Sequence, residues 1–440
     1  MHAQKAKQAA CPGRTLRLIV SLLFVLVFVA SVLAQENLSG KISGQLSAIK
    51  KAGYPVNLDE LDKWYSASAD GANAASVYAG AFSSLHTSTL GSIKLPQRGT
   101  AMTADTKQAI AGLVTENQPA IELLHKAAVS GKCRYQIDLK NGVNMELPHL
   151  AGLRDSGRLL LLNAAFNLEQ GKVEASLQSI TDTLGAALSL EDEPLLLSQL
   201  VRIALEKLSV SALERVLSQH GLEEKQIAIA ASAFRNAECP MGLHRAFVGE
   251  RCTGINLFQM SPQNRAAVFS KTSEGAARFK DNAQSVDGDF LFFLRIMESE
   301  TEVTKLPYPK RLQAAKDVRP EIIRSAKEQK YLVSAQLLPA FGSVVEKDAE
   351  NVALLRAART ALAVERFRFA NWKLPENLDS IAPSFLDAIP VDPFDGKSIR
   401  FKKLAKGYVV YSVGKDTQDN GGKEKGDSET DYDLTLTVER

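Results

Sequence analysis

The chain has 440 residues, 45% of them hydrophobic and 23% charged, so it is long enough for two or three domains and too apolar to be disordered throughout. Its formal net charge is +3, but residues 1–34 contain four basic residues and no acidic one, which leaves 49 Lys and Arg against 50 Asp and Glu. A body so close to neutral gives no electrostatic basis for binding nucleic acid, and we predict no nucleic-acid partner.

The N-terminal segment has the pattern of a targeting sequence. A basic region ending at Arg17 precedes the apolar run 18–34, whose last residues, up to Ala34, resemble a cleavage site. As a helix this run spans about 25 Å, at the short limit for crossing a bilayer. Residues 1–34 are therefore predicted to be either a cleaved signal peptide or an N-terminal membrane anchor. Either alternative exports the rest of the chain, to the periplasm or the outer face of the inner membrane, and any membrane contact is expected through this segment.

Three cysteines lie beyond this segment, an odd number in a compartment that permits disulfides. Cys239 and Cys252 flank a stretch that contains Pro240 and Gly242. If these two residues break the helix, the thiols can form a disulfide. In one straight helix they are about 20 Å apart and remain free, buried thiols. Together with Cys133, they show neither CxxC nor zinc-ligand spacing, so we predict no redox motif and no zinc site.

Residues 35–350 are predicted to form an α-helical body. In the stretch 158–190, apolar residues recur every three to four positions on both sides of a Gln-Gly-Lys turn at 170–172, a pattern typical of two antiparallel helices. This hairpin resembles a tetratricopeptide unit, although one clear copy does not establish a repeat array. The stretch 194–221 begins with a proline, ends with a glycine and predicts a further helical region.

Two stretches interrupt the helical pattern. Residues 133–150 alternate apolar and polar side chains around an Asn-Gly pair, which predicts either a small β-hairpin or an extended crossover. Residues 261–289 are polar and contain glycine, so we expect the body to divide near residues 255–290. Arg202 and Glu206, four residues apart on a predicted helix, are interpreted as a surface or partly buried pair.

Residues 351–440 are predicted to form a smaller α+β module that begins with a helix over 351–372. The runs 398–404 and 407–414 are rich in β-branched and aromatic residues and are separated by a short Ala-Lys-Gly turn, which predicts an antiparallel hairpin. The final residues, 431–440, predict another strand. The fold class is thus mainly α: a body of helical hairpins, then one helix packed on a small antiparallel sheet.

Three motifs of this module carry a family resemblance. They are Leu-Pro-Glu at 374–376, Ile-Pro-Val-Asp-Pro-Phe-Asp-Gly at 389–396 and Tyr-Ser-Val-Gly-Lys-Asp at 411–416. Their order resembles the globular domain of the major pseudopilin of type II secretion systems. The prepilin processing motif is absent from the apolar N-terminal run, so the resemblance implies the fold without the filament. The whole chain also resembles uncharacterised exported proteins of planctomycete-type bacteria, which implies no activity.

The pseudopilin resemblance implies a calcium site in the tail. In that family the loop after the Tyr-Ser-x-Gly strand binds calcium; Asp416 occupies the matching position, and Asp431 or Asp433 matches a later ligand. Asp419 adds a carboxylate, and the tail is rich in the oxygen donors that calcium prefers. The spacing does not fit an EF-hand. The alternative is an acidic turn without metal, with its Gly-Gly pair at positive φ. No other cofactor is predicted.

No motif predicts catalysis. The stretch 392–396 is interpreted as consecutive turns with Phe394 in the core, and His149 as a hydrogen-bonded loop residue. The six histidines form no metal-ligand motif, and the nucleophile-elbow, P-loop and dinucleotide patterns do not occur. We therefore predict an exported noncatalytic binding or scaffold protein of the cell envelope, with an envelope protein as its partner. The alternatives are an accessory component of a type II secretion or pilus-like system, and a hydrolase with its site between body and module.

Overall fold

The computed structural model describes residues 37–65, 73–269, 286–328, 331–426 and 430–440. A first helix covers residues 37–51. The further elements are α2 (Leu58–Trp64), α3 (Ala75–Ser83), α4 (Ala104–Glu116), α5 (Gln118–Ala128), η1 (Leu139–Asn144), α6 (Pro148–Glu169), α7 (Val173–Leu188), α8 (Leu196–Gln219), α9 (Glu224–Ala237), α10 (Gly242–Gln259), α11 (Pro262–Phe269), α13 (Val286–Val303), α14 (Lys310–Lys327), α15 (Leu332–Leu337), α16 (Pro339–Asn371), η3 (Leu378–Ser380), β1 (Arg400–Lys403), β2 (Tyr408–Ser412) and β3 (Leu434–Val438).

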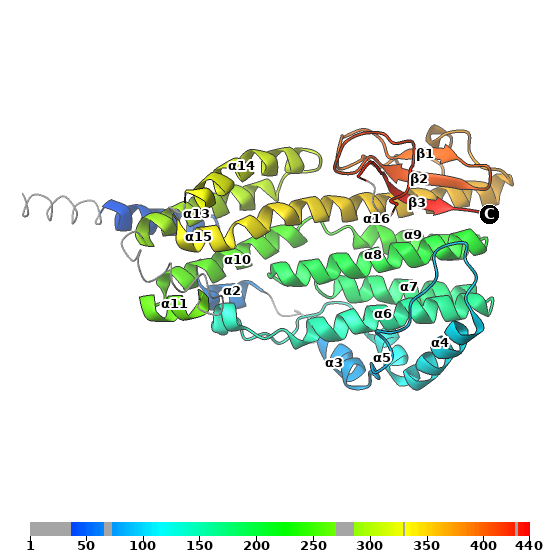
Figure 1. Ribbon diagram of the computed structural model, residues 1–440, viewed down its shortest axis with the longest axis horizontal. Coiled ribbons are helices and arrows are strands. Elements are labelled where there is room, and N and C mark those ends of the chain that lie inside the picture. Colours follow the sequence, from blue (N-terminus) through cyan, green and yellow to red (C-terminus); the bar gives the residue numbers. More distant parts are fainter. Residues whose placement is uncertain (1–36, 66–72, 270–285, 329–330, 427–429) are drawn as a thin grey trace, which may run out of the picture.

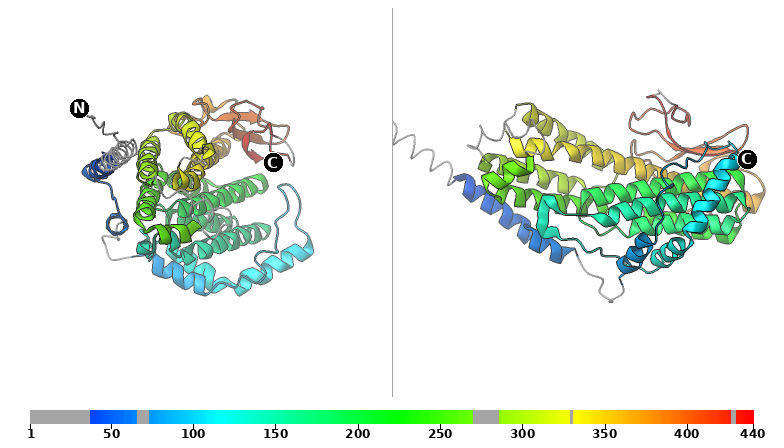
Figure 2. Two further views of the ribbon diagram at one scale, coloured as in Figure 1. Left: turned by 60° about the vertical axis from the view of Figure 1, so that its left-hand side comes forward. Right: turned by 60° about the horizontal axis from the view of Figure 1, so that its bottom comes forward.

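The fold is mainly α, as predicted, with a small sheet near the C-terminus (Figure 1). The molecule is elongated. The helix 37–51 lies toward one end, and the sheet and the C-terminus lie at the other (Figures 1 and 2). Within the described ranges, no helix has the length and apolar character needed to cross a bilayer. The predicted targeting segment, 1–34, lies outside the described residues.

The helices α6 and α7 form the predicted helical hairpin. The chain reverses at Gly171, whose φ of +71° lies in the left-handed region that glycine adopts without a steric penalty. The N–H groups of Gly171 and Lys172 donate to the carbonyls of Leu168 and Asn167, both at 2.9 Å, and so satisfy the last carbonyls of α6. Helix α8 packs along both members of the hairpin. These three helices lie side by side (Figure 1).

Helix α16 connects the two ends of the molecule. Its 33 residues extend about 50 Å, at a rise of about 1.5 Å per residue. Its first half packs with α14 and α15 and shares a buried cluster with α10, α13 and the helix 37–51. Farther along, α16 packs with α8, α9 and the sheet. The predicted boundary at residue 351 therefore falls inside one continuous helix, and the prediction that a helix begins there is wrong. Asp348 and Asn351, on either side of that boundary, are buried and bond to side chains of α8 and α14, so this polar stretch is not a surface turn between two units.

The strands form an antiparallel sheet in the order β1-β2-β3, which confirms the predicted hairpin and final strand. Every residue of β2 is buried. The helices α16 and α8 pack against the sheet, and Tyr408 donates from its hydroxyl to Glu365 of α16 at 2.9 Å. Gly422 of the following loop lies against Val409 and Tyr411. The sheet shares its buried cluster with α8 and α9, so it has no separate core.

The two predicted interruptions have different outcomes. Residues 133–147 form an extended crossover that contains η1, residues 148–150 begin α6, and the hairpin alternative is wrong. Asp138 accepts hydrogen bonds from the N–H of Lys140 and the side chain of Asn141, at 3.2 and 3.1 Å, and this local turn competes with strand pairing. The predicted subdivision near 255–290 falls partly on residues outside the described ranges.

Candidate functional site

The aspartates predicted to bind calcium organise a loop through hydrogen bonds to its backbone. Asp433 is buried, and its two oxygens accept the N–H groups of Asn420 and Gly422 at 3.3 and 2.7 Å. Asp419 accepts the N–H of Gly421 at 3.0 Å. Gly421 and Gly422 have φ of +70° and +78°, as predicted. Burial raises the pKa of the Asp433 carboxyl.

The other two aspartates, Asp416 and Asp431, also bond locally. Asp416 accepts the N–H of Gln418, and Asp431 accepts the hydroxyl of Thr430, both at 3.1 Å. In the described part of the chain, which excludes residues 427–429, no three Asp, Glu, His or Cys side chains form a group that could hold a metal ion. These hydrogen bonds favour the acidic turn without metal, and melting with and without calcium distinguishes this alternative from the calcium site.

The Asp-Pro-Phe-Asp-Gly stretch is a structural turn. Asp392 is fully buried, and its carboxylate accepts hydrogen bonds from the N–H groups of Phe394 and Val413, the hydroxyl of Ser412 and the guanidinium of Arg400, at 2.7 to 3.0 Å. Phe394 packs in the core, as predicted. A carboxylate with four donors has its lone pairs occupied, which leaves none for acid–base chemistry.

The predicted disulfide is not formed: Cys133, Cys239 and Cys252 are free. Helix α10 begins at Gly242 and continues through Cys252, which places that thiol about 15 Å along the helix from its start. Cys239 precedes the helix and cannot reach it. Burial raises the pKa of Cys239 and Cys252 to about 12, so both thiols are protonated and unreactive at neutral pH.

Ser198, Glu193 and His149 are the residue types of a catalytic triad, but their hydrogen bonds run in a different order. Glu193 accepts the hydroxyl of Ser198 and lies 2.9 Å from Nε2 of His149. The carboxylate thus stands between hydroxyl and imidazole, whereas nucleophilic catalysis needs the imidazole on the hydroxyl. His149 lies in the first turn of α6, not in a loop as predicted, and Tyr135 stacks on it with ring centres 4.4 Å apart. We interpret the group as structural.

A second buried network joins α8, α14 and α16. Arg202 and Glu206 are 1% and 0% exposed, so the prediction of a surface or partly buried pair is wrong. Arg202 lies 2.7 Å from Glu206 and 3.5 Å from Asp348. Asp348 also accepts from Arg311 at 3.1 Å and from Tyr308 at 2.7 Å. Because breaking such a network leaves an uncompensated buried charge, it fixes the positions of the three helices.

Two concave regions lie away from these networks. A cavity of about 340 Å³ between α4 and α6 has Ile110 and Phe166 in its lining and an ion pair of Lys107 and Glu169, at 2.6 Å, beside them. A crevice between α9 and α16, beside Phe385, measures about 60 Å³, which is far below the size of ordinary ligand sites. Neither lining brings together a nucleophile and a base.

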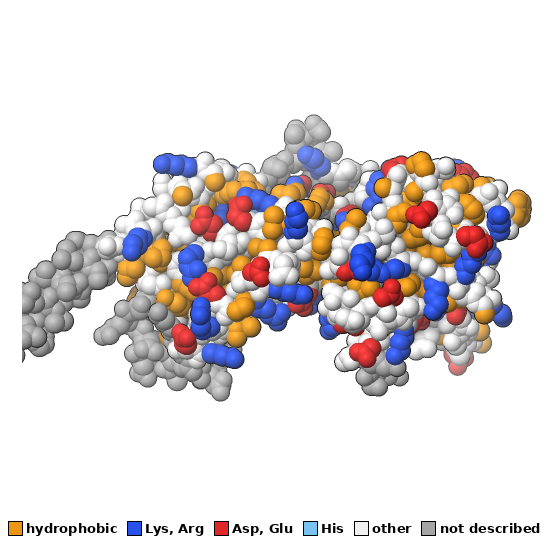
Figure 3. All heavy atoms as spheres, turned by 90° about the horizontal axis from the view of Figure 1, so that it is seen from above, with side chains coloured by type: hydrophobic (Ala, Val, Ile, Leu, Met, Phe, Trp, Pro, Cys, Tyr) orange, Lys and Arg blue, Asp and Glu red, His pale blue; other side chains and the backbone are white. Residues whose placement is uncertain are grey.

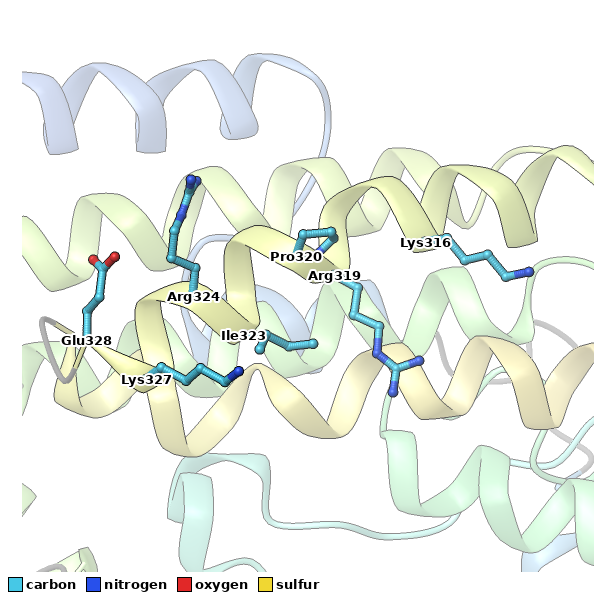
Figure 4. Close-up of a pocket in the computed structure, with 7 residues that line it drawn as sticks. All are labelled: Lys316, Arg319, Pro320, Ile323, Arg324, Lys327 and Glu328. Atoms are coloured by element: carbon cyan, nitrogen blue, oxygen red, sulfur yellow. The ribbon is translucent and has the colours of Figure 1, made fainter.

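Helix α14 presents a basic groove of about 590 Å³, lined by Lys316, Arg319, Pro320, Ile323, Arg324, Lys327 and Glu328 (Figure 4). Six of these residues lie on α14 at spacings of three and four and so form one face, and Glu328 follows the last residue of the helix. Pro320 has no N–H to donate to the carbonyl four residues earlier, which interrupts the hydrogen bonding of the helix at the middle of this face. Four cations against one carboxylate give this groove a net positive charge.

The second surface feature is the distal aromatic surface, which we define as Phe369 and Trp372. Trp372 is 93% exposed and Phe369 49% exposed. Trp372 follows the last residue of α16 with φ of +56° and ψ of +20°, and its N–H donates to the carbonyl of Arg368 at 2.8 Å. This left-handed conformation costs a residue with a Cβ about 1–2 kcal/mol, and glycine normally occupies the position. Hydrophobic side chains also gather at the sheet end of the molecule seen from above (Figure 3).

Sequence reasoning missed both surface features, although each left a signal. The basic residues of α14 recur at helical spacing in the sequence. Pro375 requires α16 to end before it, and no glycine lies nearby to form the C-terminal cap of the helix. Comparison of the chain with protein-family models, curated proteins and solved structures finds no match. The two surface features are therefore the observations that bear on function.

Proposed function

We propose that the protein is an exported, noncatalytic scaffold of the cell envelope that binds a partner protein through the distal aromatic surface. The observation that carries this proposal is Trp372, which is 93% exposed and held in a strained left-handed conformation. Backbone strain lowers folding stability, and an exposed aromatic side chain makes few packing contacts that could offset this cost. The strain at Trp372 therefore points to function. Tryptophan is also the residue type most enriched among the residues that dominate binding energy at protein interfaces.

The rest of the molecule supports the role of a scaffold. The helix 37–51 packs in the same buried cluster as the first half of α16, and Trp372 stands beyond the other end of that helix. The network around Arg202 and Asp348 holds α16 against α8 and α14. The distal aromatic surface is therefore kept at a fixed distance from residue 37. With residues 1–34 as an anchor, this geometry holds a partner at a fixed distance from the anchored end.

The residues around the distal aromatic surface indicate which groups a complementary partner surface would carry. Lys373 follows Trp372 directly and is exposed, whereas Arg368, four residues before Trp372, lies 3.8 Å from Glu365. A pocket that accepts the indole and carries acidic residues on its rim would match both the apolar and the charged parts of the surface.

The second candidate function is an accessory component of a type II secretion or pilus-like system. One long helix packed on a three-stranded antiparallel sheet is the arrangement that a pseudopilin-like unit requires, which supports this candidate. The α6–α7 hairpin is similarly compatible with a tetratricopeptide-like unit. For a hydrolase at the junction of body and sheet, the crevice of about 60 Å³ gives no support.

The test is site-specific photo-crosslinking in the envelope of the organism that makes the protein. With Lys373→benzoylphenylalanine in the full chain, we expect one covalent adduct of defined mass. The adduct should disappear when Trp372→Gly is added and persist when Val129→Ala is added, since Val129 is an exposed hydrophobic residue outside the surface, 72% accessible. An adduct that persists with Trp372→Gly would refute the proposal.

The glycine variant also separates loss of binding from loss of folding. Glycine adopts the left-handed conformation without the Cβ penalty, so Trp372→Gly should raise the free energy of unfolding by about 1 kcal/mol. Urea unfolding of the purified variant measures this change. A more stable protein that has lost its partner has lost a binding residue, whereas a destabilised variant would show that Trp372 serves the fold.

A further inference from the structure

The basic groove on α14 concentrates charge that the rest of the exported chain lacks. Between residues 310 and 327 there are six Lys and Arg and two Asp and Glu, a net charge of +4. Arg311 belongs to the buried network, and Arg319 pairs with Glu346 at 3.2 Å. Within the described ranges, Lys316, Arg324 and Lys327 form no ion pair, and all three are exposed. These three cations are available to an anionic ligand.

The same helix has two contrasting faces. Leu312, Ala315 and Ile322 are buried against the core. On the outward face, Ile323 is 43% exposed among the cations, and the exposed Pro320 lies beside it (Figure 4). Basic residues interspersed with exposed apolar ones are typical of helices that lie on a membrane surface, where the cations meet headgroups and the apolar side chains enter the interface.

The groove faces solvent at the end of the molecule where the described chain begins. The helix 37–51 bonds to α13 through Gln45 and Glu298, at 3.1 Å. Helix α13 in turn bonds to α14 through Arg295 and Glu321, at 3.0 Å. Helix α14 runs toward the end at which residue 37 lies (Figures 1 and 2). Two residues separate that helix from the apolar run 18–34.

We propose that the outward face of α14 docks on the anionic phospholipid headgroups of the membrane from which the chain emerges. From Lys316 to Lys327 the cations extend over about 16 Å of helix, which is too far for one phosphate group and suits several neighbouring headgroups. Each Lys or Arg near an anionic bilayer adds to the attraction, which falls with salt because the groups are exposed. The inference rests on export of the body and is independent of the partner at the distal aromatic surface.

Cosedimentation with lipid vesicles tests the proposal, using a chain that begins at Gln35 so that the apolar run does not bind by itself. The three buried clusters draw their residues from positions 42 to 438, so this chain keeps every described core contact. The probes are vesicles of phosphatidylcholine, and vesicles in which a third of the lipid is phosphatidylglycerol. We expect binding to the second kind, weakened by added salt, and no binding to the first.

Two matched variants locate the binding surface. Lys316→Gln, Arg324→Gln and Lys327→Gln together should weaken binding to the anionic vesicles about a hundredfold. The control carries the same change in charge at three exposed lysines elsewhere, Lys132→Gln, Lys172→Gln and Lys225→Gln, and should bind as the parent does.

Three results with vesicles would overturn the proposal: no binding of the parent chain to anionic vesicles, equal binding to both kinds of vesicle, or equal loss of binding in both triple variants. A fourth is full displacement from the vesicles by inorganic phosphate at constant ionic strength, which would identify a free anion as the ligand. Circular dichroism shows whether each variant is folded. Trp372→Gly should leave vesicle binding unchanged, so failure here and failure of the proposed partner site are distinguishable.

Discussion

Glu300 gives the sharpest prediction about stability. It lies on the buried face of α13, is 1% exposed, and neither carboxylate oxygen has a hydrogen-bond partner within the described ranges. A buried carboxylate without a partner is costly when charged, because no donor replaces the water that it has lost. Burial therefore raises the pKa of Glu300 to about 7, from an ordinary value of 4.5.

The magnitude follows from linkage between protonation and folding. Since the folded-state pKa is raised, the folded protein keeps the proton while the unfolded chain releases it. The stability that this neutral carboxyl permits is fully present below pH 4.5 and is lost as the pH rises through 7. A difference of about 2.5 pKa units corresponds to about 3 kcal/mol of unfolding free energy.

Urea unfolding of the parent chain and of Glu300→Gln across this pH range measures the effect. Glutamine has the same shape and never ionises, so the variant should be about 3 kcal/mol more stable than the parent above pH 7 and nearly equal to it below pH 4.5. Glu302→Gln is the control, because Glu302 is exposed on the same helix and pairs only at the surface with Lys305. Parallel curves for the parent and Glu300→Gln would refute the reasoning.

Two further predictions concern the backbone and the acidic loop. Gly249→Ala should lower the free energy of unfolding by about 3 kcal/mol, because its Cβ would lie 1.7 Å from the carbonyl oxygen of Pro194. Gly112→Ala, with nothing within 4 Å on α4, should raise it by about 1 kcal/mol; equal melting curves for the two would contradict this packing. Calcium or a chelator should leave the melting temperature unchanged, because Asp433 already bonds to backbone amides. A rise of several degrees with calcium, reversed by chelator, would establish the calcium site instead.

Local signals in the sequence were sufficient for much of the fold. Gly171 ends α6 because the left-handed turn it allows is a property of glycine itself, and the β-branched and aromatic residues of β2 indicate a strand without reference to any partner. The turn role of Asp392 was likewise predictable, since Asp before Pro and Asp before Gly favour turns wherever they occur.

Features that depend on distant partners were not predictable. Arg202 and Glu206 have the spacing of a surface pair, and only the approach of Asp348 and Asn351 from α16 buries them. Because Asp348 and Asn351 contact α8 from within α16, this helix is continuous across the predicted module boundary at residue 351. The exposure of Trp372 was not predictable for the same reason: most aromatic residues after a helix pack on a neighbour, and no residue of the described ranges covers this indole.

We infer that Trp372 is retained because it binds a partner, although its left-handed conformation lowers the free energy of unfolding. The most direct measurement pairs the unfolding free energy of Trp372→Gly with the yield of its envelope crosslink. We predict that the free energy of unfolding rises by about 1 kcal/mol and that the adduct is lost. A variant that is less stable than the parent, or one that still crosslinks in full, would contradict it.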